Sequence, residues 1–211
     1  MAGFLVTFEG GDGCGKSTQI KLFTEFLKKN KYDFICTREP GGTDVGEEIR
    51  EILLHSKGKM SAETEFLLFS ASRSKIVEDV IRPALQEGKV VVLDRYFDSS
   101  YTYQGYAGNL KVKDLKNITE FAIKGTVPDL TFLLDLSYDD AMKRKSGDEK
   151  LKNLDRIESK GKKYHDKVRR GYLKLAQKNK NRIVVIDANQ SIEKIEKQIK
   201  EEFLRRYNKK D

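Results

Sequence analysis

The stretch Gly10-Gly11-Asp12-Gly13-Cys14-Gly15-Lys16-Ser17 fits the pattern G-x-x-x-x-G-K-[ST]. An apolar, strand-like run precedes it at residues 4–9, and an amphipathic, helix-like run follows at residues 16–30. Glycines let a backbone wrap closely around a polyphosphate, and a helix N-terminus attracts anions. The stretch therefore predicts a phosphate-binding loop between a strand and a helix. The alternative, a glycine-rich turn that only joins the two elements, does not account for the full pattern in this context.

Each part of this loop has an expected role in binding ATP. The Lys16 ammonium would reach the β- and γ-phosphates, and the Ser17 hydroxyl would ligate Mg²⁺. The predicted ATP-binding residues are Gly10, Gly11, Asp12, Gly13, Cys14, Gly15, Lys16, Ser17 and Thr18. Because GTPases, ATPases and small-molecule kinases all use such a loop, it does not select a reaction by itself.

Short β-branched or aromatic runs alternate with longer amphipathic runs along the chain, which is typical of an α/β fold. Strands with few interior polar residues, as in a parallel sheet covered on both faces, are predicted at 4–9, 34–37, 90–94, 130–135 and 183–187. Helices are predicted at 16–30, 46–55, 62–87, 112–124, 138–145, 162–179 and 192–207, with Ser61 and Ser191 as N-caps. The sequence therefore predicts a P-loop NTPase fold, with a five-stranded parallel sheet flanked by helices.

Length and composition narrow the class of protein. With 211 residues, the chain is expected to form a single domain over 1–211. Its net charge of +8 lies largely on lysines around predicted helices, so we expect anionic nucleotides rather than nucleic acid as partners. No apolar run approaches the roughly 18 residues of a membrane span, which favours a cytoplasmic protein without a membrane partner. Cys14 and Cys36 are expected to be reduced thiols.

Polar clusters at residues 37–43 and 94–100 follow two predicted strands and indicate a site for a second substrate. The carboxyl ends of parallel strands face the ligand crevice, so these clusters should meet near the phosphate-binding loop. Arg38 and Arg95 are suited to hold a phosphate there, because guanidinium forks match phosphate oxygens.

Two further features point to a base and a metal ion. Phe69 and Arg73 lie four residues apart on a predicted helix, so a ring that stacks on a base and a guanidinium that donates to it would share one face. Taken alone, Phe69 also fits core packing. Asp94 ends an apolar strand, where a carboxylate needs water, a cation or an arginine. It is a predicted Mg²⁺ ligand together with Ser17, and a capping or arginine-pairing role is the alternative.

Six strings follow one another along the chain: F-E-G-G-D-G-C-G-K-S-T, T-R-E-P-G-G-T, L-L-F-S-A-S-R, D-R-Y-F-D-S-S-Y-T-Y-Q-G, L-D-R-I-E and Y-H-D-K-V-R-R-G-Y-L. In these strings and in their order, the sequence from Phe4 to about Ala176 resembles the thymidylate kinase family. The resemblance implies a homodimeric enzyme that uses Mg-ATP to phosphorylate dTMP to dTDP, a step towards dTTP. A kinase for uridine or cytidine monophosphate, and a regulatory nucleotide-binding protein without transfer activity, are the alternatives.

The resemblance also implies roles for residues that bind dTMP. Asp12 would lie near the sugar 3′-hydroxyl and the phosphate, and Arg95 with Arg38 would hold that phosphate. Phe69 would stack on thymine while Arg73 reads the base. Tyr103 would pack beneath the deoxyribose and disfavour a 2′-hydroxyl. The full predicted dTMP-binding set is Asp12, Arg38, Phe69, Arg73, Arg95, Ser99, Ser100, Tyr103 and Gln104.

A mobile lid at about residues 144–160 is implied as well. Family members with glycine at the place of Gly13 rely on arginines in the lid rather than in the phosphate-binding loop. Arg156 is the leading candidate for stabilising charge on the transferring phosphoryl group. The predicted catalytic residues are Lys16, Arg95, Arg144 and Arg156.

Overall fold

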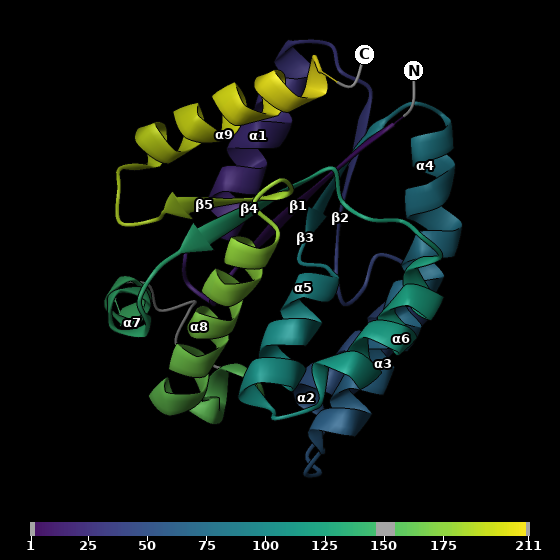
Figure 1. Cartoon of the computed structure of the whole chain (residues 1–211), viewed down its shortest axis with the longest axis vertical. Coiled ribbons are helices and arrows are strands. Elements are labelled where there is room, and N and C mark those ends of the chain that lie inside the picture. The colour runs from purple at the N-terminus through teal and green to yellow at the C-terminus, as the bar shows by residue number, and fades with distance from the viewer. Residues whose placement is uncertain (1–2, 147–154, 210–211) are drawn as a thin grey trace.

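A computed structural model describes residues 3–146 and 155–209. Its parallel strands form one sheet in the order β2-β3-β1-β4-β5 (Figure 1). The strands are β1 (Phe4–Gly10), β2 (Phe34–Arg38), β3 (Val90–Asp94), β4 (Leu130–Asp135) and β5 (Ile183–Asp187). The prediction of a five-stranded parallel sheet is confirmed, and each strand lies within one residue of its predicted bounds.

The helices alternate with these strands. They are α1 (Lys16–Lys29), α2 (Asp44–His55), α3 (Ala62–Ile76), α4 (Arg82–Gln86), α5 (Phe97–Ser100), α6 (Val112–Ile123), α7 (Tyr138–Ser146), α8 (Lys162–Lys178) and α9 (Ile192–Tyr207). Two π-helical segments, η1 (Val77–Ile81) and η2 (Tyr101–Ala107), and a short turn, η4 (Glu158–Lys160), complete the described elements. Ser61 and Ser191 cap α3 and α9 as predicted, each accepting a hydrogen bond from a backbone N–H in the first turn.

Two helix predictions need correction. The single helix predicted at residues 62–87 is divided into α3, η1 and α4. Pro83 lies in the first turn of α4 and has no N–H to donate, which interrupts the regular hydrogen-bond ladder. The sequence analysis predicts no helix at residues 97–107, yet α5 and η2 occupy them. Serine, threonine, tyrosine and glycine form helices poorly on their own, so packing against α8 stabilises this helical segment.

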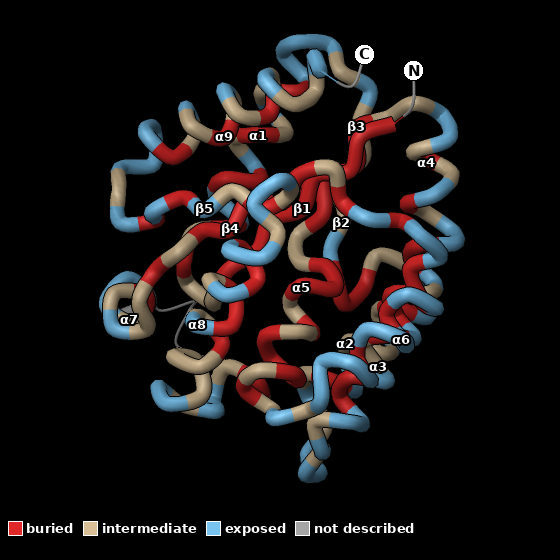
Figure 2. Tube along the Cα trace, in the orientation of Figure 1, coloured by how far each residue is buried: buried red, intermediate tan, exposed pale blue. Residues whose placement is uncertain are grey.

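Helices cover both faces of the sheet, so the central strands β1, β3 and β4 are almost fully buried, whereas the edge strands β2 and β5 are partly exposed (Figure 2). Phe4, Val6 and Phe8 of β1 pack towards α1 and α9. Leu5, between them, packs on the other face against residues of α3 and η1. This alternation follows from the two-residue period of a strand, and it places a core on each side of the sheet.

Strand register brings the predicted site residues together. Asp94 at the end of β3 pairs in register with Phe8 of β1 and with Arg38 of β2. The loop after β1 therefore lies beside the residues that end β2 and β3. Cys14 is buried, Cys36 is exposed, and both are free thiols, as predicted. Within the described ranges, no helix combines the length and the apolar character that a membrane span requires.

Candidate active site

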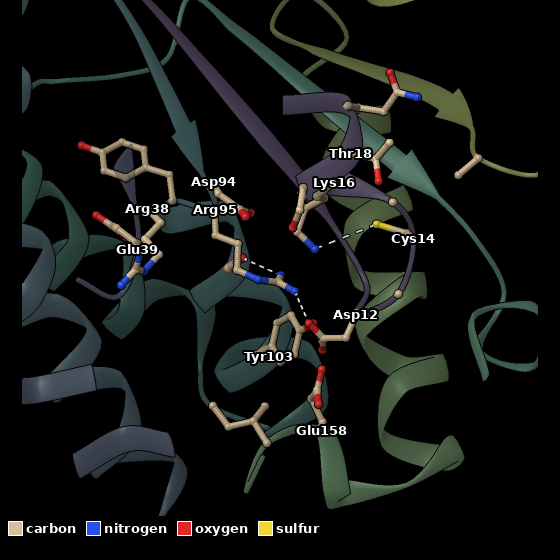
Figure 3. A pocket seen from close by; sticks show the side chains of 18 of the residues that line it. Asp12, Cys14, Lys16, Thr18, Arg38, Glu39, Asp94, Arg95, Tyr103 and Glu158 are labelled. Carbon is tan, nitrogen blue, oxygen red and sulfur yellow. Dashed lines mark hydrogen bonds and ion pairs between the residues drawn. The ribbon is translucent and has the colours of Figure 1, made fainter. Parts of the chain in front are cut away.

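A cavity of about 760 Å³ opens at the carboxyl ends of β1, β2 and β3 (Figure 3). This volume suits a site for small molecules. The predicted site residues that line it are Asp12, Gly13, Cys14, Gly15, Lys16, Ser17, Thr18, Arg38, Phe69, Arg73, Asp94, Arg95, Ser99, Ser100, Tyr103, Gln104 and Arg144. Gly10 and Gly11, at the base of the loop, and Arg156 do not line it. One cavity thus contains most of both predicted half-sites.

The backbone of the phosphate-binding loop depends on glycine at two positions in particular. Gly10 has φ 140°, and a Cβ there would lie 2.5 Å from the carbonyl oxygen of Leu134. Gly15 has φ 95° and precedes α1 without a side-chain cap. Both conformations favour glycine. The first N–H groups of α1 lack a side-chain acceptor at the N-cap, so they are available to an anion.

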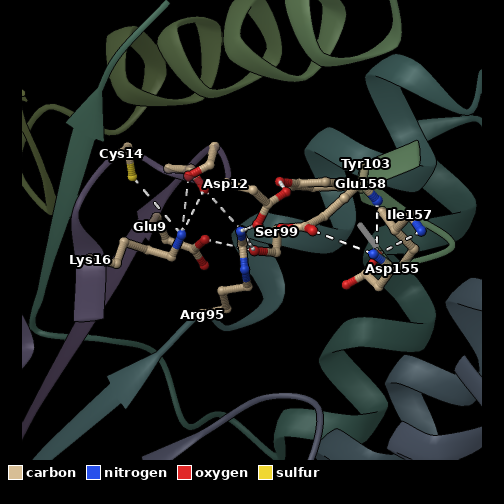
Figure 4. A network of polar contacts seen from close by, with 12 residues as sticks. Glu9, Asp12, Cys14, Lys16, Arg95, Ser99, Tyr103, Asp155, Ile157 and Glu158 are labelled. Atoms are coloured by element: carbon tan, nitrogen blue, oxygen red, sulfur yellow. Dashed lines mark hydrogen bonds and ion pairs between the residues drawn. The ribbon is translucent and has the colours of Figure 1, made fainter. Parts of the chain in front are cut away.

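The Lys16 side chain folds back over this loop and lines the cavity. Its Nζ donates to the carbonyl oxygens of Gly10 at 3.3 Å and Gly11 at 3.2 Å, and lies 3.9 Å from Sγ of Cys14 (Figure 4). Among the described residues, Lys16 forms no ion pair with a carboxylate. Its positive charge is therefore available to neutralise a phosphate.

Arg95 crosses from the end of β3 to the same loop (Figure 4). Its Nη1 donates to the Gly10 carbonyl at 3.0 Å, and its Nη2 donates to Oδ1 of Asp12 at 2.5 Å. Tyr103 donates to the other Asp12 oxygen at 3.1 Å, and its ring lies 5.2 Å from the Arg95 guanidinium carbon. Three of the residues predicted for the second substrate, Asp12, Arg95 and Tyr103, thus form one cluster at the mouth of the loop.

Glu9 supports this cluster and was missed by the sequence analysis. Its buried carboxylate accepts from the Tyr96 N–H at 2.8 Å, the Ser99 hydroxyl at 2.7 Å and the Tyr172 hydroxyl at 2.7 Å. Burial, and then the charge of Asp98, raises the pKa of Glu9. An acid at the end of an otherwise apolar strand was the available signal, as at Asp94.

The Glu9 contacts also fix an unusual backbone conformation. Arg95 has φ 65°, which is rare for a residue other than glycine. Its N–H donates to the Phe8 carbonyl at 2.9 Å, and Glu9 holds the N–H of the next residue, Tyr96. These hydrogen bonds keep Arg95 in a conformation that turns its side chain towards the loop.

A second group of residues forms the opposite wall of the cavity. The Arg73 side chain is 1% exposed, its Nε donates to Oε2 of Glu39 at 2.9 Å, and its Nη2 forms an ion pair with the same oxygen at 2.8 Å. Nη2 also donates to Ser100 Oγ at 3.1 Å. Nη1 is buried and has no hydrogen-bonding partner within residues 3–146 and 155–209. Phe69 is half-buried beside it, so this wall offers a ring and a free donor, as the sequence predicts for a base site.

Glu39, the partner of Arg73, was also missed by the sequence analysis. The titration of Glu39 leads to a testable prediction. Burial raises the pKa of Glu39 from 4.5 to about 7, although Arg73 favours the ionised form. The folded chain therefore keeps a proton that the unfolded chain releases between these values, so the free energy of unfolding falls as the pH rises through this window. From about pH 5 to about pH 8, titration of Glu39 should lower the free energy of unfolding of the unchanged chain by about 2 kcal/mol. Glu39→Gln should lack this decrease. Urea unfolding at both pH values measures it.

The control for this experiment is Glu48→Gln, which changes an exposed acid on α2. It should keep the pH dependence of the unchanged chain. If Glu39→Gln also kept that dependence, Glu39 would not titrate as its burial requires.

Guanidinium groups gather at the end of β2. Arg38 donates to both carboxylate oxygens of Glu47, at 3.0 and 2.9 Å, and its side chain is 53% exposed. Arg50 lines the cavity and donates to the Pro40 carbonyl at 2.9 Å. Sequence reasoning missed Arg50, although it stands out as the one arginine on the acidic helix α2. Arg38, Arg50 and Arg95 together make this end of the cavity suitable for phosphate.

The predicted Mg²⁺ ligands, Asp94 and Ser17, both line the cavity. Oδ1 of Asp94 is buried and has no hydrogen-bonding partner among the residues whose structure is described, and Ser17 is exposed at the cavity. In the described ranges, no group of three His, Cys, Asp or Glu side chains could hold a metal ion. Mg²⁺ in phosphate sites commonly takes one or two protein ligands and completes its shell with phosphate and water oxygens. Asp94 and Ser17 fit such a site.

The lid candidates occupy two different places. Arg144 lines the cavity and donates to the Ala188 carbonyl at 2.6 Å. Arg156 donates to Oε1 of Glu65 at 2.6 Å and to the Leu53 carbonyl at 2.9 Å, outside the cavity. In this conformation the buried Glu65 carboxylate pairs with Arg156, which does not line the cavity. Residues 147–154 of the predicted lid lie outside the described residues.

A loop for a polyphosphate and a guanidinium-lined pocket for a second anion share one cavity, which is the arrangement of a P-loop phosphotransferase. Residues 8–199 match the family model for thymidylate kinase. The chain is 46% identical to a thymidylate kinase of Thermoanaerobacter sp. (strain X514), over 94% of this chain and 96% of that protein. It is 47% identical to one of Kosmotoga olearia, over 94% of each. The chain therefore belongs to the thymidylate kinase family, whose members are nucleoside monophosphate kinases.

A solved structure agrees with this assignment. The crystal structure of thymidylate kinase from Ehrlichia chaffeensis is similar with a TM-score of 0.70 and 30% sequence identity. The similarity covers 88% of this chain and 93% of that chain. It confirms the P-loop NTPase fold predicted from the glycine-rich stretch.

Proposed function

We propose that this chain transfers the γ-phosphoryl group of ATP to dTMP, giving ADP and dTDP. The observation that carries the proposal is the shared cavity, with the Lys16 loop on one side and the Phe69 and Arg73 wall on the other. Arg95 lies between them, hydrogen-bonded to the loop. A triphosphate on the loop and a nucleoside monophosphate against the wall would bring their phosphates together near Arg95.

The loop side binds the donor in this proposal. Backbone N–H groups at the start of α1 hold the phosphates, and Lys16 neutralises charge on the β- and γ-phosphates. Ser17 and Asp94 would hold Mg²⁺, which supplies further charge neutralisation when bound. No side chain needs to act as a general base, because the attacking phosphate oxygen of dTMP is already an anion. Positioning and charge neutralisation therefore supply most of the rate enhancement.

The opposite side binds the acceptor. Phe69 stacks on thymine, and the free Nη1 of Arg73 donates to a carbonyl oxygen of the base. Arg95 holds the acceptor phosphate, assisted by Arg38. Tyr103 packs beneath the sugar, and its hydrogen bond to Asp12 keeps both groups beside the reacting phosphates.

Closure of the lid completes the proposed cycle. Arg144 already lines the cavity, so it needs only to exchange the Ala188 carbonyl for a phosphate oxygen. Arg156 would have to leave Glu65 before it could reach the transferring group. Exclusion of water by the closed lid would favour transfer over hydrolysis of ATP.

A substrate panel tests the proposed reaction. The chain is incubated with ATP and Mg²⁺ and with dTMP, dUMP, UMP, CMP or AMP, and ADP and the nucleoside diphosphate are measured. We expect dTMP to have the highest kcat/KM. If another monophosphate had the highest kcat/KM, that monophosphate would be the substrate in place of dTMP. ATP binding without transfer to any monophosphate would indicate a regulatory nucleotide-binding protein.

We also propose that the chain acts as a homodimer. Apolar side chains are exposed on the adjacent helices α3 and α6, with Leu67 55%, Ile118 36% and Phe121 80% exposed. A second copy of the chain would bury this face. Phe121→Glu should weaken self-association at least about tenfold, because it places a charge in the apolar contact. Light scattering after size-exclusion chromatography measures the mass.

Val185→Glu is the matched control. Val185 is also an exposed apolar residue, with 45% of it accessible, but it lies on the edge strand β5 and not on α3 or α6. This variant should remain dimeric. A dimeric Phe121→Glu variant would exclude this face, and an unchanged chain that is monomeric would exclude the homodimer itself.

A further inference from the structure

Glu65, near the start of α3, joins the base side of the cavity to the segment that carries Arg156. Its side chain is 1% exposed. Oε2 accepts from Nε2 of Gln104 at 3.1 Å. Oε1 accepts from Nη1 of Arg156 at 2.6 Å and from Nζ of Lys160 at 2.7 Å. The roles described so far include its contact to Arg156 but not its contact to Gln104.

The charge state of Glu65 limits what Gln104 can do. Burial alone would raise the pKa of Glu65, but hydrogen bonds from Lys160, Arg156 and Gln104 outweigh burial and lower it. An ionised carboxylate only accepts hydrogen bonds, so Gln104 must turn its NH₂ group towards Glu65. The amide oxygen of Gln104 has no hydrogen-bonding partner among the residues that the structure describes. Because Gln104 lines the cavity, it offers an acceptor to a ligand there.

Arg73 offers the complementary group. Its buried Nη1 has no hydrogen-bonding partner in the described part of the chain, so the same wall carries a free donor. Nη2 of Arg73 is hydrogen-bonded to Ser100, and Gln104 lies one helical turn beyond Ser100. The donor and the acceptor are thus neighbours. Thymine and uracil present a donor at N3 and an acceptor at O4, whereas cytosine presents the reverse pattern.

We propose that Glu65 is a positioning residue that sets base specificity: it fixes the Gln104 amide so that the pocket accepts pyrimidines with an N3–H and rejects cytosine. This inference rests on the proposed function, because it concerns the same acceptor site. A buried donor or acceptor left unpaired by the wrong base is costly, so dTMP should be preferred over dCMP by at least about 1000-fold in kcat/KM.

Glu65→Gln gives a specific test. Arg156 and Lys160 only donate, so they should keep the amide oxygen at position 65 and turn its NH₂ group towards Gln104. Gln104 would then reverse, and its NH₂ group would face N3 of the base. The ratio of kcat/KM for dTMP over dCMP should fall about 100-fold, through a higher KM for dTMP and a lower KM for dCMP.

The double variant Glu65→Gln with Gln104→Glu exchanges the two groups. The new carboxylate at position 104 would accept from the amide at position 65 and present an acceptor to the base, so the dTMP preference should return. A merely structural role for the Glu65 ion pairs would not produce this rescue. Lys160→Gln removes one cation from Glu65 and leaves the contact to Gln104, so it should retain the preference.

Steady-state kinetics with dTMP and dCMP, and thermal unfolding of each variant, separate the outcomes. An unchanged dTMP/dCMP ratio in folded Glu65→Gln would overturn the inference. If Glu65→Gln did not fold, the double variant would decide. A double variant that folds without a preference for dTMP would overturn the inference, and so would a double variant that does not fold. Failure of the unchanged chain to phosphorylate dTMP would instead overturn the proposed function.

Discussion

Lys16→Ala is expected to lower kcat for dTMP phosphorylation by at least about 1000-fold, because Lys16 provides a positive charge directed at the transferring phosphoryl group. In the structure this ammonium contacts only loop carbonyls and Cys14 and has no carboxylate partner among the described residues. Its positive charge is therefore free to stabilise negative charge that moves between the two phosphates. A coupled assay of ADP release at saturating ATP and dTMP measures kcat.

Lys21→Ala is the matched control, since Lys21 is exposed on the same helix, α1. It should keep the kcat of the unchanged chain. Thermal unfolding should be similar for both variants, because Lys16 forms no ion pair with any residue that the structure describes. A Lys16→Ala variant with near-normal kcat would remove Lys16 from the mechanism.

Arg95→Ala is expected to lower kcat/KM for dTMP by about 1000-fold, because it removes a bidentate phosphate ligand and a charge at the transfer site. The same guanidinium contacts Asp12, Gly10, Ser99 and Tyr172, so its loss also loosens the groups around the acceptor phosphate. The loss should affect dTMP much more than ATP. Initial rates at varied dTMP and varied ATP separate the two effects.

Arg82→Ala is the control for this variant, because Arg82 is an exposed arginine on α4. Its kinetic constants should match those of the unchanged chain. If Arg95→Ala raised KM for ATP and left the dTMP constants unchanged, Arg95 would belong to the donor side of the cavity.

Much of the fold could be predicted from local sequence patterns. The glycine-rich stretch after an apolar run predicted the phosphate-binding loop and α1, and the short apolar runs predicted the strands of the sheet. Residues 97–107 were not predicted to be helical, because their helix depends on packing against α8 and the sequence of the segment alone does not show that contact. The π-helical turns at η1 and η2 likewise depend on tertiary contacts.

Most of the charged residues that line the candidate site were predicted, and the buried acids that hold them in place were missed. Arg38, Arg73 and Arg95 stand in recognisable strings, and the structure places them around one cavity. Glu9 and Glu65 hold their partners across long sequence separations: Tyr172 lies 163 residues from Glu9, and Arg156 lies 91 residues from Glu65. Such pairings depend on how the chain folds, so one sequence shows where the acids are but not which residues they bind.

A crystal structure of the chain with dTMP, Mg²⁺ and a non-hydrolysable ATP analogue would examine the two-sided cavity itself. The triphosphate should lie on the loop from Gly10 to Ser17, with thymine between Phe69 and the free Nη1 of Arg73 and the acceptor phosphate at Arg95. If thymine lay elsewhere, or if both nucleotides competed for the loop, transfer across this cavity would be ruled out.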